Sequence, residues 1–164
     1  MSDQGKTYAA FIEGELKTER ERRSAYDARG QVIVTSSGAL VTLLGRLAAL
    51  VKSSTVATFP APVVIAVGVA LALFVGAAAC GIVAGWNKYY AAATASTLAR
   101  MIGEHWTDDE VDARNNVAAV QVRTVDTLRR ANAFKARWVG IGLIVQVSAL
   151  VASGVAAGFV IANL

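Results

Sequence analysis

Polar side chains inside long uncharged stretches are the residues of this chain that could do chemistry. Arg46 is the only charged residue between Gly30 and Val51. A charge at the centre of a bilayer costs about 2.5–3.5 kcal/mol on insertion scales, so it either snorkels to the headgroups or has a function. Both interpretations stay open: snorkelling to the outer surface near Lys52, or lining a pore or pairing with a partner. The other candidate pore or interhelix polar residues are Thr35, Ser36, Ser37, Thr42, Gln146 and Ser148.

The sequence does not indicate catalytic or metal-binding chemistry. His105 is the only histidine and Cys80 the only cysteine, so neither a His-rich nor a Cys-rich metal site is expected. The acidic residues around His105 are expected to cap a helix and to be solvated, with a weak divalent-cation site as the lesser alternative. No Walker A, GxSxG, HExxH or dinucleotide-binding pattern occurs. We therefore expect no catalytic residue, no cofactor and no metal, and a protein that is not an enzyme.

The distribution of charge predicts the elements that carry the polar residues. Hydrophobic residues make up 55% and charged residues 17% of the 164 residues, which excludes a disordered chain. No charge occurs from Ser53 to Asn87 or from Trp138 to Leu164. A bilayer core of about 30 Å needs roughly 20 apolar helical residues, and helices of a soluble core keep a polar face that these stretches lack. We predict an all-α integral membrane protein with three transmembrane helices and a small cytoplasmic helical bundle.

Lysine and arginine set the expected topology. Residues 1–30 carry six of them and residues 86–137 carry eight. The positive-inside rule places both segments in the cytoplasm and the C-terminus outside. The richness in Ala, Val and Arg suits a high-GC bacterium, so the expected membrane is the bacterial cytoplasmic membrane. The predicted segments are a cytoplasmic amphipathic helix at 1–30, transmembrane helices at 31–51, 62–85 and 138–161, an external loop at 52–61, a cytoplasmic helical segment at 86–137 and an external tail at 162–164.

A basic collar with an aromatic residue precedes two of the predicted spans. Residues 22–29 and 130–137 share the pattern Arg-x-x-Ala-aromatic-x-Ala-Arg, which fits membrane entry with or without an internal duplication. Anionic lipids attract such collars at about 1 kcal/mol per basic residue, so the net charge of +4 predicts a lipid partner and no nucleic acid. The predicted membrane-interface residues are Arg22, Tyr26, Arg29, Trp86, Arg130, Phe134, Arg137 and Trp138.

Contacts between the spans are expected from polar and small residues. Gln146 is predicted at the depth of Ser37 and Gly38, where amide–hydroxyl bonds are worth about 0.6 kcal/mol on average. The polar residues are expected to hold the helices together through such bonds. The alternative is that they line a water-filled path. Glycines allow close helix approach within one subunit or between subunits. The candidate helix-packing glycines are Gly76, Gly81, Gly85, Gly154 and Gly158.

The cytoplasmic segments are expected to be mostly helical. The helix that ends the second span is predicted to continue through Ile102, and Thr107 to Glu110 match a capping box with Thr107 as the N-cap. One helix is then expected from residue 108 through the third span. Its apolar stripe, with Val111, Val122 and Val125, must pack within the chain or form a coiled coil between subunits.

The layout of residues 13–87 resembles a known class of membrane protein. A charged cytoplasmic helix, with Glu-Arg-Glu-Arg-Arg at 19–23 and Arg29-Gly30 at its end, leads directly into a hairpin of spans, and a second cytoplasmic helix follows. This arrangement resembles the two-span membrane effectors of bacterial nucleotide-signalled immunity, the SLATT and Pycsar-type proteins. The resemblance implies an oligomer that disturbs the membrane when triggered. The third span departs from that layout, and no functional residue is carried over.

Three functions are compatible with this architecture. The leading expectation is a self-associating, homo-oligomeric membrane protein that forms a pore or perturbs the membrane as an effector. The alternative is a scaffold or accessory subunit that binds a cytoplasmic protein partner through residues 88–137. A phage holin is the third, and it would be toxic on its own.

Overall fold

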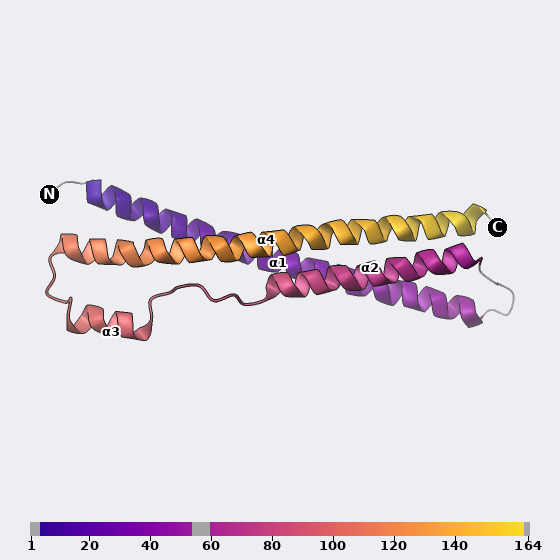
Figure 1. The fold of residues 1–164 in the computed structure, drawn as a ribbon, viewed down its shortest axis with the longest axis horizontal. Helices are drawn as coiled ribbons and strands as arrows, with labels where there is room; N and C mark the ends of the chain where they lie inside the picture. The colour runs from indigo at the N-terminus through magenta and orange to yellow at the C-terminus, as the bar shows by residue number, and fades with distance from the viewer. Residues whose placement is uncertain (1–3, 54–59, 163–164) are drawn as a thin grey trace. The chain divides into compact units, whose positions relative to one another are not determined.

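The computed structural model describes residues 4–53 and 60–162, and every regular element among them is an α-helix (Figure 1). In chain order they are α1 (Gln4–Ser53), α2 (Ala61–Gly85), α3 (Ala95–Gly103) and α4 (Glu110–Ala162). The predicted all-α class is confirmed for the described residues. Of the predicted loop at 52–61 and tail at 162–164, residues 54–59 and 163–164 lie outside them.

The contacts divide the chain into two compact units. The charged unit comprises Met1–Ala25 and Asn87–Phe134, and the apolar unit comprises Tyr26–Trp86 and Lys135–Leu164. Helices α1 and α4 therefore each contribute residues to both units, whereas α3 belongs to the charged unit and α2 to the apolar unit. Each unit has its own small buried cluster, and each is described by itself below.

Two helices among the described residues are long and apolar enough to cross a membrane. They are α2 and the longer α4, whose apolar window lies within Glu110–Ala162. The sequence predicted three such helices, and two are found among the described residues, because α1 does not reach the required apolarity. Polar residues explain the difference: Gln31, three threonines and serines in succession at 35–37, Thr42 and Arg46 interrupt the apolar sequence of α1.

Glycines bring the helices of the apolar unit together. A Cβ placed on Gly81 of α2 would lie 2.7 Å from the carbonyl oxygen of Gly30 in α1 and 2.8 Å from Cγ2 of Val34. A Cβ on Gly142 of α4 would lie 3.2 Å from Cβ of Cys80. These backbones approach so closely because neither glycine carries a side chain. The adjoining core consists of Ile33, Ala77, Ala84 and Val139, with Trp138 and Val145 packed against it.

A second cluster joins α1 to α4 in the charged unit. Leu16 of α1 packs with Val125 and Leu128 of α4, and all three side chains are buried. The apolar stripe of α4 therefore does pack within the chain at this point. Val111 and Val122, which were expected on the same stripe, remain exposed.

The predicted continuation of α2 into a cytoplasmic helix through Ile102 is wrong. Helix α2 ends at Gly85, because Trp86 takes an extended conformation with ψ of 133°, and residues 87–94 are not helical. Side-chain bonds to α1 and α4 hold this segment instead. Arg23 Nη2 donates to Asn87 Oδ1 at 2.8 Å, and the Ala91 amide donates to Thr127 Oγ1 at 3.0 Å.

The predicted N-cap of the last helix, Thr107, is wrong, because the carboxylate of Asp109 caps this helix. Asp109 caps α4, since its Oδ1 accepts from the amides of Val111 at 2.8 Å and Asp112 at 2.9 Å. Thr107 was expected in this role, but α4 starts at Glu110, and a capping side chain reaches only two or three residues onward. From Glu110 the helix runs without a break to Ala162, which confirms the single long helix.

The glycine contact predicts the effect of adding one methyl group. Gly81→Ala should lower the stability of the protein by about 1–3 kcal/mol, since its Cβ meets backbone that cannot move aside easily. The matched control is Gly85→Ala, where nothing lies within 4 Å of the new Cβ and helix propensity gains up to about 1 kcal/mol. Thermal unfolding in detergent measures both, and equal unfolding temperatures for the two variants would refute the contact.

Candidate functional site

A polar face runs along α1 inside the apolar unit. Gln31, Thr35, Thr42 and Arg46, together with Gly38, are spaced so that they lie on one face of an α-helix. All five are exposed. We call these residues the polar face of α1.

Exposed apolar side chains flank this polar face. Val32 is 63% exposed and Leu43 is 55% exposed on the same helix. Polar residues surrounded by exposed apolar surface are unusual for a protein in water, where the reverse arrangement needs no explanation. The exposed surface of this part of α1 therefore combines a polar face with apolar side chains beside it.

The hydroxyls of the polar face are satisfied within α1. Thr35 Oγ1 donates to the carbonyl oxygen of Gln31 at 3.0 Å, and Thr42 Oγ1 donates to that of Gly38 at 2.9 Å. Arg46 differs, because no carboxylate pairs with it in the described part of the chain. Arg46 is thus the group of this face that most needs water or an anion.

The remaining polar candidates lie elsewhere. Gln146 Nε2 donates to Ser36 Oγ at 2.7 Å, so the expected amide–hydroxyl bond joins α4 to α1. Ser37 is fully buried, and its hydroxyl has no partner among the described residues. Ser148 is exposed and donates to the Ile144 carbonyl of its own helix at 3.0 Å. Ser36, Ser37 and Gln146 therefore belong to helix packing in the single chain, and of the polar candidates Thr35, Thr42 and Arg46 lie on the polar face of α1.

The candidate packing glycines also divide into two groups. Gly81 makes the close contact described above, and a Cβ on Gly76 would lie 3.8 Å from Cγ1 of Val145. Nothing in the described chain lies within 4 Å of a Cβ built on Gly85, Gly154 or Gly158. The GxxxG pair of α4 is therefore open on the surface of the single chain.

Sequence reasoning missed a buried carboxylate in the charged unit. Glu19 is 1% exposed, and its Oε1 accepts from Arg22 Nη1 at 2.9 Å and from Arg129 Nε at 3.4 Å. Asn132 Nδ2 donates both to Glu19 Oε2 and to its backbone oxygen at 2.9 Å. Arg129 also pairs with Glu15.

A signal for this network was present in the sequence. Glu19 follows the buried Leu16 by three residues, and Asn132 follows the buried Leu128 by four, so each lies on the buried stripe of its helix. A polar residue that continues an apolar stripe is a candidate for a buried partner on the facing helix.

The two basic collars meet through one ion pair in the apolar unit. Lys135, whose side chain is 1% exposed, pairs with Asp27, and both occupy the sixth position of the shared pattern. Among the other predicted interface residues, Arg22 and Arg130 pair with Glu19 and Asp126. Tyr26 is half-buried, Phe134 receives Lys88 on its ring, and Trp138 packs on the core; Arg29, Trp86 and Arg137 are exposed.

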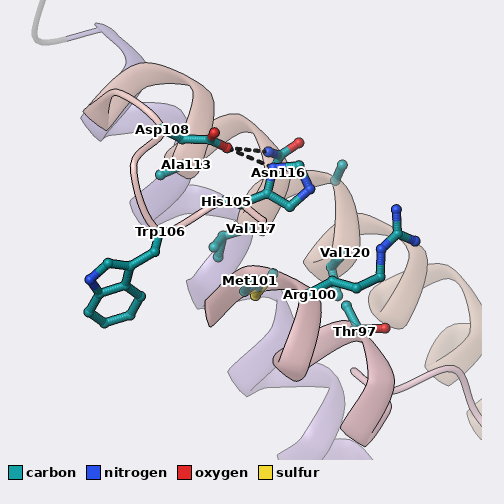
Figure 2. Close-up of a pocket in the computed structure, with 11 residues that line it drawn as sticks. Thr97, Arg100, Met101, His105, Trp106, Asp108, Ala113, Asn116, Val117 and Val120 are labelled. Carbon is teal, nitrogen blue, oxygen red and sulfur yellow. Dashed lines mark hydrogen bonds and ion pairs between the residues drawn. The ribbon is translucent and has the colours of Figure 1, made fainter. Parts of the chain in front are cut away.

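A cavity of about 550 Å³ lies between α3 and the first turns of α4 in the charged unit (Figure 2). Met101, Val117 and Val120 supply apolar lining. At one end His105 Nδ1 lies 3.0 Å from Asp108 Oδ2, which also accepts from Asn116 Nδ2 at 3.4 Å. The indole of Trp106 turns away from this group (Figure 2). Within the described residues no three His, Cys, Asp or Glu side chains converge as metal ligands would.

Comparison with protein-family models, curated proteins and solved structures finds no match to this chain. The resemblance to SLATT and Pycsar-type effectors therefore stays an expectation drawn from the layout of the sequence. The exposed apolar surface, the polar face of α1 and the cavity are the features from which a function can be argued.

Removing the buried carboxylate tests the network that joins α1 to α4. Glu19→Ala should destabilise the protein by about 1–3 kcal/mol, because it removes the buried carboxylate that accepts from Arg22, Arg129 and Asn132. Glu21→Ala is the matched control, since Glu21 is exposed and should change stability by less than about 0.5 kcal/mol. Circular dichroism during unfolding in detergent reports both values, and a Glu19→Ala protein as stable as the control would contradict the account.

Proposed function

We propose that the chain is an integral membrane protein that assembles into homo-oligomers and forms an aqueous pore lined by the polar face of α1. The observation that carries the proposal is the exposure of Arg46, Thr35 and Thr42 on a helix whose neighbouring exposed side chains are apolar. A pore wall needs both surfaces, because one side of each helix faces water and the other faces lipid or protein.

Exposed apolar side chains support insertion into a membrane. Only 22% of the apolar window of α2 and 11% of that of α4 is buried, whereas the core helix of a soluble protein would be mostly buried. Ile65 is 65% exposed, Ile144 is 69% exposed and Val151 is 62% exposed. A bilayer covers such surface without any further protein.

Residues 31–51 of α1 serve as a third, more polar span in this proposal. Their contacts support it: Ser36 accepts from Gln146, and Gly30 and Val34 lie against Gly81. A segment that packs on two apolar helices shares their surroundings. With three spans, the lysine and arginine distribution places the N-terminus in the cytoplasm and the C-terminus outside.

Self-association follows from the same polar face. In a single subunit, lipid would surround Arg46 at a cost of about 2.5–3.5 kcal/mol. A ring of subunits removes this cost by turning the polar face of each α1 toward a common water-filled centre. The open glycines Gly154 and Gly158 offer surface on α4 for close contact between subunits.

The cavity of the charged unit supports a scaffold as the second candidate. Leu98 is 52% exposed, Ile102 is 66% exposed and Trp106 is 78% exposed in or just after α3, beside the cavity lined by Met101 and Val117. Aromatic and apolar residues around a hollow are typical of protein-binding surfaces. Under this alternative the purified protein would be electrically silent in a bilayer.

Conductance of the reconstituted protein separates the two candidates. Purified protein in planar bilayers should conduct ions and prefer anions, because a ring of Arg46 side chains gives the pore a positive field. Arg46→Gln should move the anion-to-cation permeability ratio toward one, and Arg46→Glu should reverse the preference. The reversal potential in a salt gradient measures the change.

Ser148→Ala is the matched control, because Ser148 is exposed on α4 and bonds only within its own helix. It should conduct with the selectivity of the unmodified protein. Silent bilayers containing a stable oligomer, or channels whose selectivity ignores the charge at position 46, would contradict the proposed function.

A further inference from the structure

We propose that Arg23 and Lys88 form a binding site for the phosphate of an anionic phospholipid headgroup. This inference rests on the proposed membrane insertion. It adds a lipid ligand, held where the second segment of the charged unit begins at Asn87. The site consists of Arg23 of α1, the non-helical residues Asn87, Lys88 and Tyr90, and Phe134 of α4, whose ring Lys88 contacts. All five belong to the charged unit.

Arg23 is held in place by neutral partners. Its Nη2 donates to Asn87 Oδ1 at 2.8 Å, and its guanidinium carbon lies 4.6 Å from the centre of the Tyr90 ring. Nη1 is buried and has no hydrogen-bond partner in the described part of the chain. A half-buried guanidinium with an unused donor is stabilised by an anionic oxygen. A ligand reaches the buried Nη1 only when a neighbouring side chain moves, and the Tyr90 ring on the guanidinium is itself 40% exposed.

Lys88 is positioned in the same way. Its Nζ lies 3.6 Å from the centre of the Phe134 ring, which orients the ammonium without neutralising it. The ring face occupies one side of the cation, and the ammonium N–H groups that point away from the ring remain for other partners. Lys88 itself is exposed, so a ligand can reach it directly.

These two cations differ from most of the basic residues in the charged unit that make contacts. Arg22, Arg100, Arg114, Arg129 and Arg130 each pair with a carboxylate. Neither Arg23 nor Lys88 pairs with one among the described residues. Their charge is therefore oriented but not cancelled, which is the state that suits a phosphate ligand.

The position along the chain selects a lipid as the source of the phosphate. Lys88 lies three residues after Gly85, the last residue of the apolar helix α2. Trp86 is 67% exposed and Tyr89 is fully exposed on either side of it, and such aromatic residues prefer the headgroup region of a bilayer. We therefore expect a phosphodiester headgroup in that region to pair with these cations.

Lipid binding is measured by native mass spectrometry of the detergent-purified protein with added phosphatidylglycerol or phosphatidylcholine. We expect phosphatidylglycerol to bind at least about tenfold more tightly, which corresponds to ~1.4 kcal/mol. Arg23→Gln with Lys88→Gln should remove this preference, and Lys88→Gln alone, at an exposed position, should reduce it. The matched control Arg123→Gln changes an exposed arginine of α4 and should retain the preference.

The arms of the experiment separate the sources of phosphate and the two proposals. Inorganic phosphate at millimolar concentration should not displace the lipid; displacement would show a general anion site and overturn the lipid assignment. A membrane-embedded protein with no preference for phosphatidylglycerol, or with a preference that the double variant retains, overturns this inference and leaves the pore intact. Recovery of the unmodified protein in the soluble fraction after carbonate extraction overturns both.

Discussion

The need to remove apolar surface from water governs this structure. Helices α2 and α4 bury only 22% and 11% of their apolar windows within the chain, so most of that surface must be covered by something else. In the proposed function a bilayer covers it and excludes water from the backbone, a condition that helices meet because they satisfy their own amides. The absence of strands among the described residues and the glycine contacts between Gly30 and Gly81 are consistent with that solvent.

Polar groups in such a protein must then be paired, capped or given a function. Ser36 and Gln146 pair with each other, Lys135 pairs with Asp27, and Glu19 collects three donors. Arg46, Arg23 and Lys88 are among the cations that pair with no carboxylate in the described chain. The two proposals assign these three to different surroundings, a water-filled pore for Arg46 and lipid phosphate for the others.

The sequence predicted helices correctly where a single pattern, such as an uncharged run, covered the whole element. It failed where contacts between distant residues determined a helix end or the role of a side chain. Uncharged runs predicted α2 and the apolar part of α4, and the lack of Gly or Pro before Gly140 predicted that α4 is one long helix. Depth matching placed Gln146 near Ser37 and Gly38, and its bond is to the neighbouring Ser36. The break after Gly85 was missed, because bonds from Arg23 and Thr127 hold residues 87–91 out of a helix and local propensity does not report them. The cap at Asp109 was missed because Thr107, two residues before it, also carries a side-chain oxygen that can accept from amides of the first turn. The role of Glu19 depends on Asn132 and Arg129, more than a hundred residues away.

Accessibility of position 46 to water tests the central claim most directly. Arg46→Cys in a Cys80→Ala background leaves one thiol on the polar face of α1, and Cys80 is buried, so its loss removes no accessible group. A charged, membrane-impermeant methanethiosulfonate added to an open channel should modify the thiol and change its conductance in steps. A thiol that stays unmodified while the channel conducts, or a modification that leaves the current unchanged, would contradict a pore lined by α1.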